Sequence, residues 1–423
     1  MRILIIGSGG REHAIAMALS KSPNQNQLFA IPGNPGISEY CECENIVAYN
    51  FEEVKNFAKN NNIDLVVVGP EVPICDGITD YLKEYKINVF APSQDASKLE
   101  SSKKFTKEIA FENNIPTGKA RWFNNQKDAS AYLDVIGAPY VIKADGLAAG
   151  KGVAICENLA DANDSLKDIF DGKFGRGQSV LIEEFLYGEE LSYFAITDGK
   201  DILPLIGAQD HKRLLDGDEG PNTGGMGAYC PPPILSPELE GKIMSQILEP
   251  TIHGLRKRGI EYKGVLFAGL MVRENEPSLI EYNIRFGDPE TQALLMLMKS
   301  DFAELLHETI NGNIKNYSLE WQEKRAITVV LANEGYPSHY SKDAEIYGIN
   351  DAEMNPNVKV FHAGTTMING ALRATGGRVL NVTSIADTLD LAREHAYSAI
   401  DKISFKGMVY RNDIAWRALN KST

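Results

Sequence analysis

Short apolar runs alternate with helical stretches over the first ninety residues of the chain. The runs are rich in β-branched residues and cover residues 3–6, 28–31, 65–68 and 89–91. Between them, residues 13–21 and 51–60 have the pattern of helices. Strands that alternate with helices in this way form a parallel sheet, because each helix returns the chain to the end of the sheet at which the strands begin. The sequence therefore predicts an α/β fold with an N-terminal parallel sheet.

The next part of the chain predicts a helix and then a small α+β lobe. The helix is expected over 93–114 and the lobe over about 117–187. The lobe would contain a glycine-rich loop and two strands, at 140–143 and 180–183.

The remainder predicts a further α/β segment and a separate C-terminal unit. The α/β segment extends to about residue 321, and the last unit would begin with a strand at 326–331 and end in a helix over 385–402. We therefore expect an N-terminal parallel α/β domain, a central domain with a small lobe, and a C-terminal α+β domain. Their predicted bounds are 1–100, 101–325 and 326–423.

Composition excludes several classes of partner. The net charge of -14, without long runs of lysine or arginine, argues against a nucleic-acid or anionic-membrane surface. The longest apolar runs have strand length, and the chain enters a strand at once without a signal segment. The five cysteines form no zinc-binding pattern, so we expect reduced, structural thiols. We predict a cytoplasmic monomer that binds small molecules, with no nucleic-acid or membrane partner.

Three polar residues occupy alternate positions of a predicted strand at 279–286. Glu281, Asn283 and Arg285 would share one face. The intervening side chains, expected to face the core, are Ile280, Tyr282, Ile284 and Phe286. Carboxylate and amide oxygens suit Mg2+ or Mn2+, and an arginine beside them can stabilise a phosphoryl group in transfer. The alternative interpretation is an ordinary solvated strand face.

A glycine-rich turn lies between residues 209 and 229. Asp210 and Lys212 precede it, and Thr223, Gly224 and Gly225 lie within it. The glycines predict a turn whose free amides face an anion, either a phosphate or a carboxylate.

A second glycine-rich turn follows the first predicted strand. Gly9, Gly10 and Arg11 lie where a helix begins, a position that favours a phosphate. Glu12 stands where a dinucleotide fingerprint needs its third glycine, and no acid ends the second strand. We therefore expect a phosphate-bearing substrate rather than NAD, with a structural turn as the alternative. Glu71 follows another strand at the same sheet edge and could contact a sugar hydroxyl or an amine.

Two lysines flank a glycine-rich loop in the predicted lobe. Lys143 ends a strand, and Lys151 with Gly152 leads into the next, without the order of a P-loop. Two ammonium groups and a movable loop suit a nucleotide triphosphate, although a solvated hairpin would give the same pattern. Residues 183–186 then form a linker whose backbone could bind adenine, followed by Glu190 for the ribose, with solvated acidic residues as the alternative.

The assembled motifs resemble the phosphoribosylamine–glycine ligase (glycinamide ribonucleotide synthetase) family of the ATP-grasp superfamily over essentially the whole chain. They are GSGGREHA at 7–14, GPE at 69–71, IKADGLAAGKGV at 142–153, EEFLYGEE at 183–190, QDHKR at 209–213, GPNTGGMGAY at 220–229 and RFGDPETQ at 285–292. The resemblance implies that ATP, as co-substrate with Mg2+ or Mn2+, phosphorylates glycine and that 5-phosphoribosylamine attacks the glycyl phosphate.

The resemblance also implies roles for individual residues. For ATP, it implies phosphate contacts from Lys103, Lys143 and Lys151 beside Gly152, adenine contacts from Glu183, Glu184, Phe185 and Leu186, and a ribose contact from Glu190. For the other substrates, it implies Gly9, Gly10, Arg11, Asn34 and Glu71 on the phosphoribosylamine side, together with Lys212, Thr223, Gly224 and Gly225. At the reacting groups, it implies Glu281 and Asn283 as metal ligands, Arg285 at the acyl phosphate, and Asp210 and Asp288 at the glycine ammonium.

Three other functions are compatible with parts of the pattern. An ATP-grasp carboxylase would activate bicarbonate, and the turn at 209–229 argues against it. A dinucleotide oxidoreductase lacks its fingerprint, and a nucleotide sensor would not need metal ligands beside an arginine.

Overall fold

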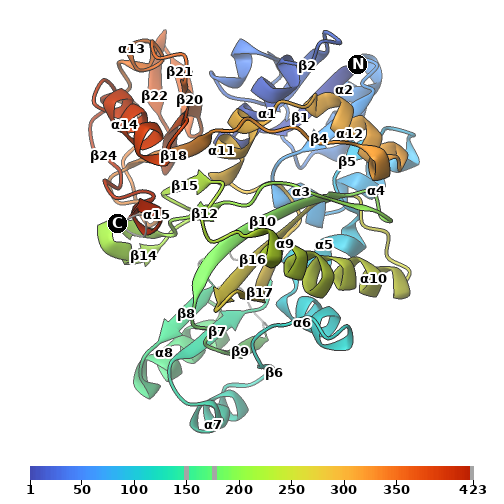
Figure 1. The fold of residues 1–423 in the computed structure, drawn as a ribbon, viewed down its shortest axis with the longest axis vertical. Coiled ribbons are helices and arrows are strands. Elements are labelled where there is room, and N and C mark those ends of the chain that lie inside the picture. The colour runs from blue at the N-terminus through green and yellow to red at the C-terminus, as the bar shows by residue number, and fades with distance from the viewer. Residues whose placement is uncertain (147–151, 174–178, 420–423) are drawn as a thin grey trace.

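The computed structural model describes residues 1–146, 152–173 and 179–419. Figure 1 shows an N-terminal domain and a C-terminal domain above a central sheet, with a smaller lobe below it. Lys151, predicted to contact ATP, lies outside the described residues. None of the helices in the described ranges is long and apolar enough to cross a membrane.

The N-terminal domain is built on a five-stranded sheet of order β3-β2-β1-β4-β5, and every pairing in it is parallel. Its strands are β1 Arg2–Gly7, β2 Gln27–Pro32, β3 Glu42–Cys43, β4 Leu65–Val68 and β5 Val89–Phe90. Its helices are α1 Gly10–Ser20, η1 Ile37–Glu39, α2 Phe51–Asn60, α3 Glu71–Cys75, α4 Ile78–Glu84 and α5 Gln94–Ser101. The apolar runs read from the sequence are buried on both faces, as parallel strands require, so the predicted sheet is confirmed.

The single helix predicted over 93–114 is wrong, because the chain forms two helices there. α5 ends at Ser101 and α6 spans Lys103–Glu112. Ser102 between them is extended, and its hydroxyl accepts a hydrogen bond from Phe105 N at 3.2 Å. A serine that caps a new helix competes with continuation of the preceding one, which explains the break.

The smaller lobe contains a four-stranded antiparallel sheet of order β6-β9-β7-β8, covered by two helices. Its elements are β6 Ala120–Phe123, α7 Gln126–Ile136, β7 Tyr140–Ala144, β8 Val153–Cys156, α8 Leu159–Phe170 and β9 Val180–Glu184. The prediction gave the two central strands with their bounds, expected a strand after Gly152 without bounds, and missed the edge strand β6. Both edge strands, β6 and β8, are largely half-buried or exposed, so they lack the continuous apolar pattern of a core strand.

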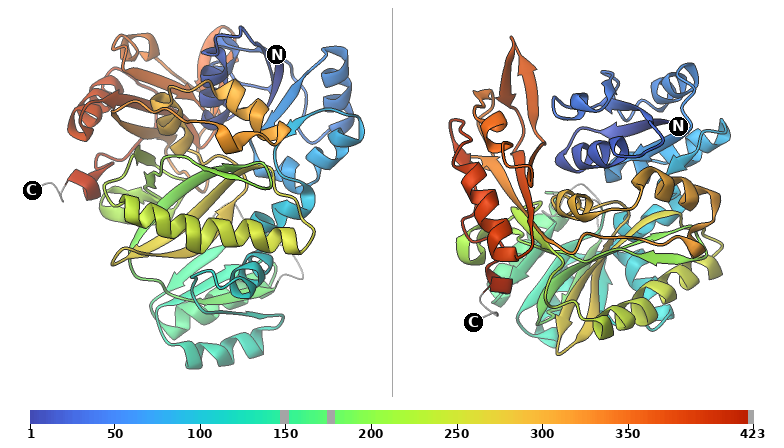
Figure 2. Two further views of the ribbon diagram at one scale, coloured as in Figure 1. Left: turned by 45° about the vertical axis from the view of Figure 1, so that its right-hand side comes forward. Right: turned by 45° about the horizontal axis from the view of Figure 1, so that its top comes forward.

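The central sheet has the order β11-β10-β16-β17 and is antiparallel. Its strands are β10 Glu189–Thr197, β11 Ile202–Pro204, β16 Gly264–Arg273 and β17 Glu276–Asn283. One continuous helical stretch packs along it, formed by α9 Pro237–Ile243, the π-helix η3 Met244–Leu248 and α10 Glu249–Lys257 (Figure 2). A register shift in β17 leaves Ile280 half-buried, so its predicted place in the core was wrong.

The C-terminal sheet has the order β12-β15-β18-β23-β20, with β24 paired to β18. Its strands are β12 Gln209–Asp210, β15 Gly227–Cys230, β18 Arg325–Asn333, β20 Val358–His362, β23 Arg378–Ala386 and β24 Met408–Val409. The predicted helix over 385–402 begins later, since α14 is Leu389–Ile400 and is capped by Thr388, whose hydroxyl accepts from Leu391 N at 3.2 Å. The glycine-rich turn between residues 209 and 229 starts on β12 and ends on β15, both strands of this sheet.

The remaining elements are short or connect the domains. They are β13 Arg213–Leu215, η2 Asp216–Asp218, β14 Glu219–Asn222, α11 Glu290–Leu297, α12 Phe302–Asn311, η4 Ile314–Asn316, β19 Ala344–Glu345, α13 Ile349–Ala352, β21 Thr365–Ile368, β22 Ala371–Ala374 and α15 Trp416–Leu419. Helix α11 packs against α1 and against β15, β18 and β23, so it lies where the N-terminal and C-terminal domains meet (Figure 1).

Candidate active site

The end of β17 presents two oxygen-bearing side chains. Glu281 and Asn283 are half-buried, and neither side chain has a hydrogen bond or ion pair within the described ranges. Gly269 lies opposite Glu281 on β16, where a Cβ atom would approach the Glu281 Cγ atom to 3.3 Å. The carboxylate and the amide are therefore available to a ligand, and their hard oxygens fit a divalent metal. No group of three or more acidic, histidine or cysteine side chains among the described residues can hold one, so water or phosphate oxygens would have to complete the coordination.

Arg285 follows β17 and is held between two carboxylates. Its Nε lies 3.1 Å from Glu71 Oε2, and its Nη2 lies 3.2 Å from Glu100 Oε1. Glu100 also accepts a hydrogen bond from Ile284 N at 2.8 Å, which fixes the backbone beside the arginine. Burial alone would lower the pKa of Arg285, but Glu100 and Glu71 raise it. Glu71, predicted to contact substrate, is thus also an anchor for Arg285.

A buried group of charges joins helix α6 to strand β9. Glu183 is 2% exposed, and its carboxylate pairs with Lys107 and, at 2.5 Å, with Lys143. Lys107 also donates to Thr117 Oγ1 at 2.6 Å and to Gly118 O at 3.1 Å. Burial would raise the pKa of Glu183, but the two lysines hold it below its usual value. The Glu183 side chain is therefore occupied inside the protein, so any contact with adenine there would come from the backbone.

We expect Lys107→Met to destabilise the protein by roughly 3 kcal/mol, because it leaves Glu183 short of one buried counter-ion. The measurement is urea unfolding followed by circular dichroism. The control is Lys167→Met, which removes an exposed pair with Asp171 at 2.9 Å and should leave the stability close to that of the wild type. Equal stability of the two variants would contradict the structural role of Lys107.

The linker after β9 carries free backbone groups. Glu184 N donates to Lys119 O at 2.8 Å and is part of the lobe's sheet. Phe185 and Leu186 are half-buried, and in the described part of the chain their backbone groups form no hydrogen bond outside the strand ladders. Lys103 begins α6 and lies against the residues that follow β7, where its Nζ donates to Gly146 O at 2.9 Å. Gly152 O accepts from Ala144 N at 2.8 Å, which pairs Gly152 with the end of β7.

Three carboxylates and a lysine gather around strand β12. Lys212 Nζ lies 2.6 Å from Glu190 Oε2, and both side chains are partly exposed. Glu290, the first residue of α11, is buried and accepts from Ser192 Oγ at 3.2 Å. Burial raises the pKa of Asp210 to about 7, opposed by Lys212 and reinforced by Glu290 and Glu190. An excess of carboxylates over cations suits a positively charged ligand group. The sequence motif contained Glu290, but nothing in its spacing revealed this neighbourhood.

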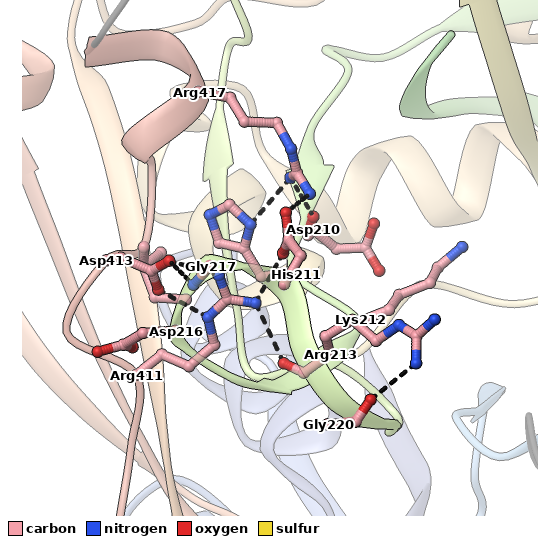
Figure 3. Close-up of polar contacts among 12 residues, drawn as sticks. Asp210, His211, Lys212, Arg213, Asp216, Gly217, Gly220, Arg411, Asp413 and Arg417 are labelled. Carbon is pink, nitrogen blue, oxygen red and sulfur yellow. Dashed lines mark hydrogen bonds and ion pairs between the residues drawn. The ribbon is translucent and has the colours of Figure 1, made fainter. Parts of the chain in front are cut away.

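His211 points away from that cluster (Figure 3). Its ring is buried, Ala415 N donates to its Nε2 at 2.8 Å, and Arg417 Nη1 lies 3.0 Å from its Nδ1. Burial, reinforced by Arg417 and Arg411, lowers its pKa to about 3. His211 is therefore neutral and serves as an attachment point for the C-terminal segment.

The glycine-rich turn does not present bare amides, contrary to the prediction. Thr223 N donates to Lys212 O at 2.8 Å, and Gly224 N donates to Tyr336 Oη at 3.0 Å. Gly225 N donates to Thr223 Oγ1 at 3.0 Å. Gly225 has a φ of +109° and lies so close to Pro289 that an added Cβ would be 2.5 Å from its Cδ atom. The glycines therefore serve close packing against the 285–292 motif, because only glycine combines this φ with this contact.

Asp288 joins three parts of the molecule. Its carboxylate accepts from Gln292 Nε2 at 3.0 Å and from Arg11 N at 3.4 Å, and it lies 3.5 Å from Arg378 Nη1. Arg378 also donates to Gly224 O at 2.7 Å and to Asp288 O at 2.6 Å. Burial would raise the pKa of Asp288, but Arg378 and Arg11 lower it. Asp288 was predicted to bind an ammonium group, and the structure gives it protein partners on each side.

The N-terminal glycine turn encloses Glu12. Gly9 N donates to Glu12 Oε2 at 2.6 Å, and Arg11 Nε donates to Glu12 Oε1 at 2.6 Å. A Cβ atom would collide with the Glu12 side chain at each of Gly7, Gly9 and Gly69. Glu12, which replaces the third glycine of a dinucleotide fingerprint, therefore fills the space between the strand ends.

Two predicted substrate residues are engaged in packing at the same edge. Asn34 Nδ2 donates to Ser8 O at 2.8 Å and to His362 O at 2.9 Å, so this amide links the N-terminal turn to the C-terminal sheet. Gly10 lies against Asn381 and Gln292, where no side chain would fit. Gly9 remains half-buried at the sheet edge.

Comparison with known proteins shows which proteins this chain is similar to. Family descriptions of phosphoribosylglycinamide synthetase match residues 1–100 (N domain), 101–291 (ATP-grasp A domain) and 326–417 (C domain). The chain is 48% identical over 424 residues to the phosphoribosylamine–glycine ligase of Rhizobium meliloti (strain 1021), and the match covers 100% of each. It is also 48% identical over 422 residues to the phosphoribosylamine–glycine ligase of Brucella melitensis biotype 1, and that match covers 100% of this chain and 99% of the relative.

Solved structures agree with this placement. The crystal structure of phosphoribosylamine–glycine ligase from Thermotoga maritima has a TM-score of 0.86 at 34% identity, covering 98% of this chain and 100% of the other. The biotin carboxylase domain of the Hydrogenobacter thermophilus 2-oxoglutarate carboxylase, covering 97% of this chain and 91% of the other, has a TM-score of 0.71 at 15% identity and shares the fold alone. The chain therefore belongs to the phosphoribosylamine–glycine ligase family of ATP-grasp enzymes.

Proposed function

We propose that the site at the end of β17 ligates glycine to 5-phosphoribosylamine through a glycyl phosphate, giving glycinamide ribonucleotide, ADP and phosphate. Family membership makes the chain an ATP-dependent ligase that uses a divalent metal. The observation that carries the assignment of residues is the pair Glu281 and Asn283 at the end of β17, with Arg285 two residues after the strand. Two free oxygen ligands lie there beside an arginine held by two carboxylates.

Glu281 and Asn283 would hold the metal, for which we propose Mg2+ or Mn2+. When bound, the metal would neutralise phosphate charge and help orient the transferred group. Burial lowers the pKa of Lys103, and the Glu281 carboxylate partly offsets this, so a lysine suited to phosphate binding lies near the metal ligands. The linker backbone at Phe185 and Leu186 is free to contact adenine.

Glycine would bind between the carboxylate cluster and Arg285. Asp210 and Glu290 supply negative charge for its ammonium group, and Arg285 would face its carboxylate. The charge of Arg285 also acts on Glu290, which indicates that the two sides of this space are close together. In this arrangement the carboxylate lies near the metal ligands, where ATP phosphates would be held.

The chemistry needs no protein nucleophile. A glycine carboxylate oxygen attacks the γ-phosphorus of ATP, and ADP leaves. The amine nitrogen of phosphoribosylamine then attacks the carbonyl carbon of glycyl phosphate, phosphate leaves, and the nitrogen loses a proton. Catalysis therefore comes from positioning and from stabilisation of phosphoryl charge, for which Arg285 is placed. Gly9 and Glu71, at the C-terminal edge of the N-terminal sheet, would line the phosphoribosylamine side.

Release of ADP by the purified protein tests this proposal. The assay contains ATP, Mg2+ and glycine, with and without phosphoribosylamine formed in situ from ribose 5-phosphate and ammonia. Release that requires both glycine and phosphoribosylamine supports the ligase. Release that depends on bicarbonate and ignores glycine would overturn it in favour of an ATP-grasp carboxylase.

The state of Asp210 predicts a pH dependence of glycine use. The pKa of the Asp210 carboxyl is about 7, above its ordinary value of 3.8. Ionisation of Asp210 therefore lowers the stability of the folded protein as the pH rises through about 7. Binding of an ammonium group nevertheless needs the ionised form. We expect kcat/KM for glycine to fall about tenfold per unit as the pH drops below about 7, while the KM for ATP changes little.

Asp210→Asn provides the comparison for this pH profile. It should weaken glycine binding at neutral pH and remove the inflection near pH 7. An unchanged inflection in this variant would assign the titration to another group.

A further inference from the structure

We propose that Arg417 is a positioning residue, which fixes Asp210 and Lys212 in the site by holding His211 between them. This inference rests on the proposed roles of Asp210 and Lys212 at the substrates. It makes the C-terminal segment, defined here as residues 411–417, a working part of a site whose other residues lie far earlier in the chain.

The alternation of side chains along β12 is the first step of the argument. Successive side chains of an extended strand point to opposite sides, so residues on either side of His211 share one face. Figure 3 shows this arrangement: the Asp210 and Lys212 side chains point one way, and the His211 ring points toward Arg417. β12 pairs with β15 alone in its sheet, and hydrogen bonds from His211 N to Gly227 O at 2.9 Å and from Met226 N to His211 O at 2.8 Å continue that pairing. The backbone is therefore held on one side, and the direction of the side chains of residues 210–212 is left to other contacts.

Contacts from the C-terminal segment hold the opposite face. Ala415 N donates to His211 Nε2 at 2.8 Å, and Arg417 Nη1 lies 3.0 Å from His211 Nδ1 and 3.5 Å from Asp210 O. Arg417 Nη2 is fixed in turn by Asp218 Oδ2 at 2.5 Å. The guanidinium therefore connects the strand to the hairpin that follows it.

Arg411 holds that hairpin from the same segment. It is completely buried, pairs with Asp413 through two contacts of 2.7 Å, and reaches Asp218 at 2.8 Å and Arg213 O at 3.1 Å. Gly217 N donates to Asp413 Oδ2 at 2.8 Å. Both arginines have carboxylate partners, so the buried charges are compensated. Through this network, a displacement of the C-terminal segment would move the backbone on both sides of His211.

The test is Arg417→Gln in the full-length protein, compared with Arg393→Gln. Arg393 holds the same segment through Asn412 O at 2.6 Å and, among the described residues, forms no hydrogen bond or ion pair with β12, so it is a matched control. We expect Arg417→Gln to raise the KM for glycine about tenfold, the equivalent of one charge-assisted hydrogen bond, with less than about a twofold change in the KM for ATP. Arg393→Gln should leave both constants within about twofold.

A second variant changes Asp218, the carboxylate partner of Arg417. Asp218→Asn weakens the anchor of Arg417 without touching residues 210–212, and it should raise the KM for glycine in the same selective way. Arg417→Gln with wild-type constants, or equal losses for glycine and ATP, would overturn the inference. Asp210→Asn separates this result from failure of the functional proposal. If Asp210→Asn weakens glycine use while Arg417→Gln keeps wild-type constants, only the positioning role is overturned.

Discussion

Replacing Glu281 by glutamine is expected to lower kcat by about a thousandfold, while the folded structure survives. The substitution keeps the size of the side chain and removes the negative oxygen that suits a divalent metal. The Glu281 side chain has no hydrogen-bond or ion-pair partner among the described residues, so the folded protein loses neither kind of contact. The measurements are the rate of ADP release at saturating Mg2+ and the thermal midpoint of the variant.

Glu276→Gln is the control for this result. Glu276 begins the same strand and pairs with Lys242 at 2.6 Å on the surface. It should retain kcat within about twofold, because an exposed ion pair contributes little. If Glu281→Gln retains wild-type turnover and metal dependence, the metal lies elsewhere.

Replacing Arg285 by lysine is expected to lower kcat about a hundredfold or more, with a smaller change in the KM for ATP. A guanidinium can contact Glu71 and Glu100 and still present a planar donor edge to a phosphoryl group, whereas an ammonium group cannot do all three. The loss should fall on kcat because charge on the acyl phosphate develops in the transition state. Steady-state kinetics in glycine and in ATP measure this division.

Arg258→Lys is a close structural control, because Arg258 also lies between two glutamates, with Glu112 at 2.6 Å and Glu108 at 3.5 Å. That group lies between α6 and α10, outside the proposed site, and should leave kcat unchanged. Glu100→Gln should cause an intermediate loss, since it keeps an acceptor for Ile284 N and removes one charge beside Arg285. Equal effects of Arg285→Lys and Arg258→Lys would contradict a catalytic role for Arg285.

The parts of the fold predicted from the sequence are those in which one physical pattern dominates. The N-terminal strands are buried on both faces and therefore appear as continuous apolar runs. The edge strand β6 was missed because it is only partly buried, with Arg121 exposed. Ser102 ended a helix through local capping, which an apolar period does not reveal. The helix was predicted to begin at Ile385, which lies in strand β23, because an apolar side chain fits either pattern.

The same distinction applies to the site. The period of two along β17 placed Glu281 and Asn283 on one face, because strand geometry alone sets that relation. The partners that hold the site are distant in sequence: Glu100 and Arg285 are 185 residues apart, and Arg417 and His211 are 206 apart. Spacing along the chain carries no information about such pairs, and the tertiary fold alone brings them together.

Glu12 and the glycines around it have a consequence for how this family can vary. Gly9 and Gly69 do not have positive φ angles, and the nearest obstacle to a side chain at each is the Glu12 carboxylate. The requirement for glycine at these positions therefore depends on the residue at position 12. Alanine at position 9 should be harmful beside glutamate and tolerated beside a smaller residue, so the effects of substitutions at these sites are epistatic. Relatives that lose one member of the group would be expected to change the others with it.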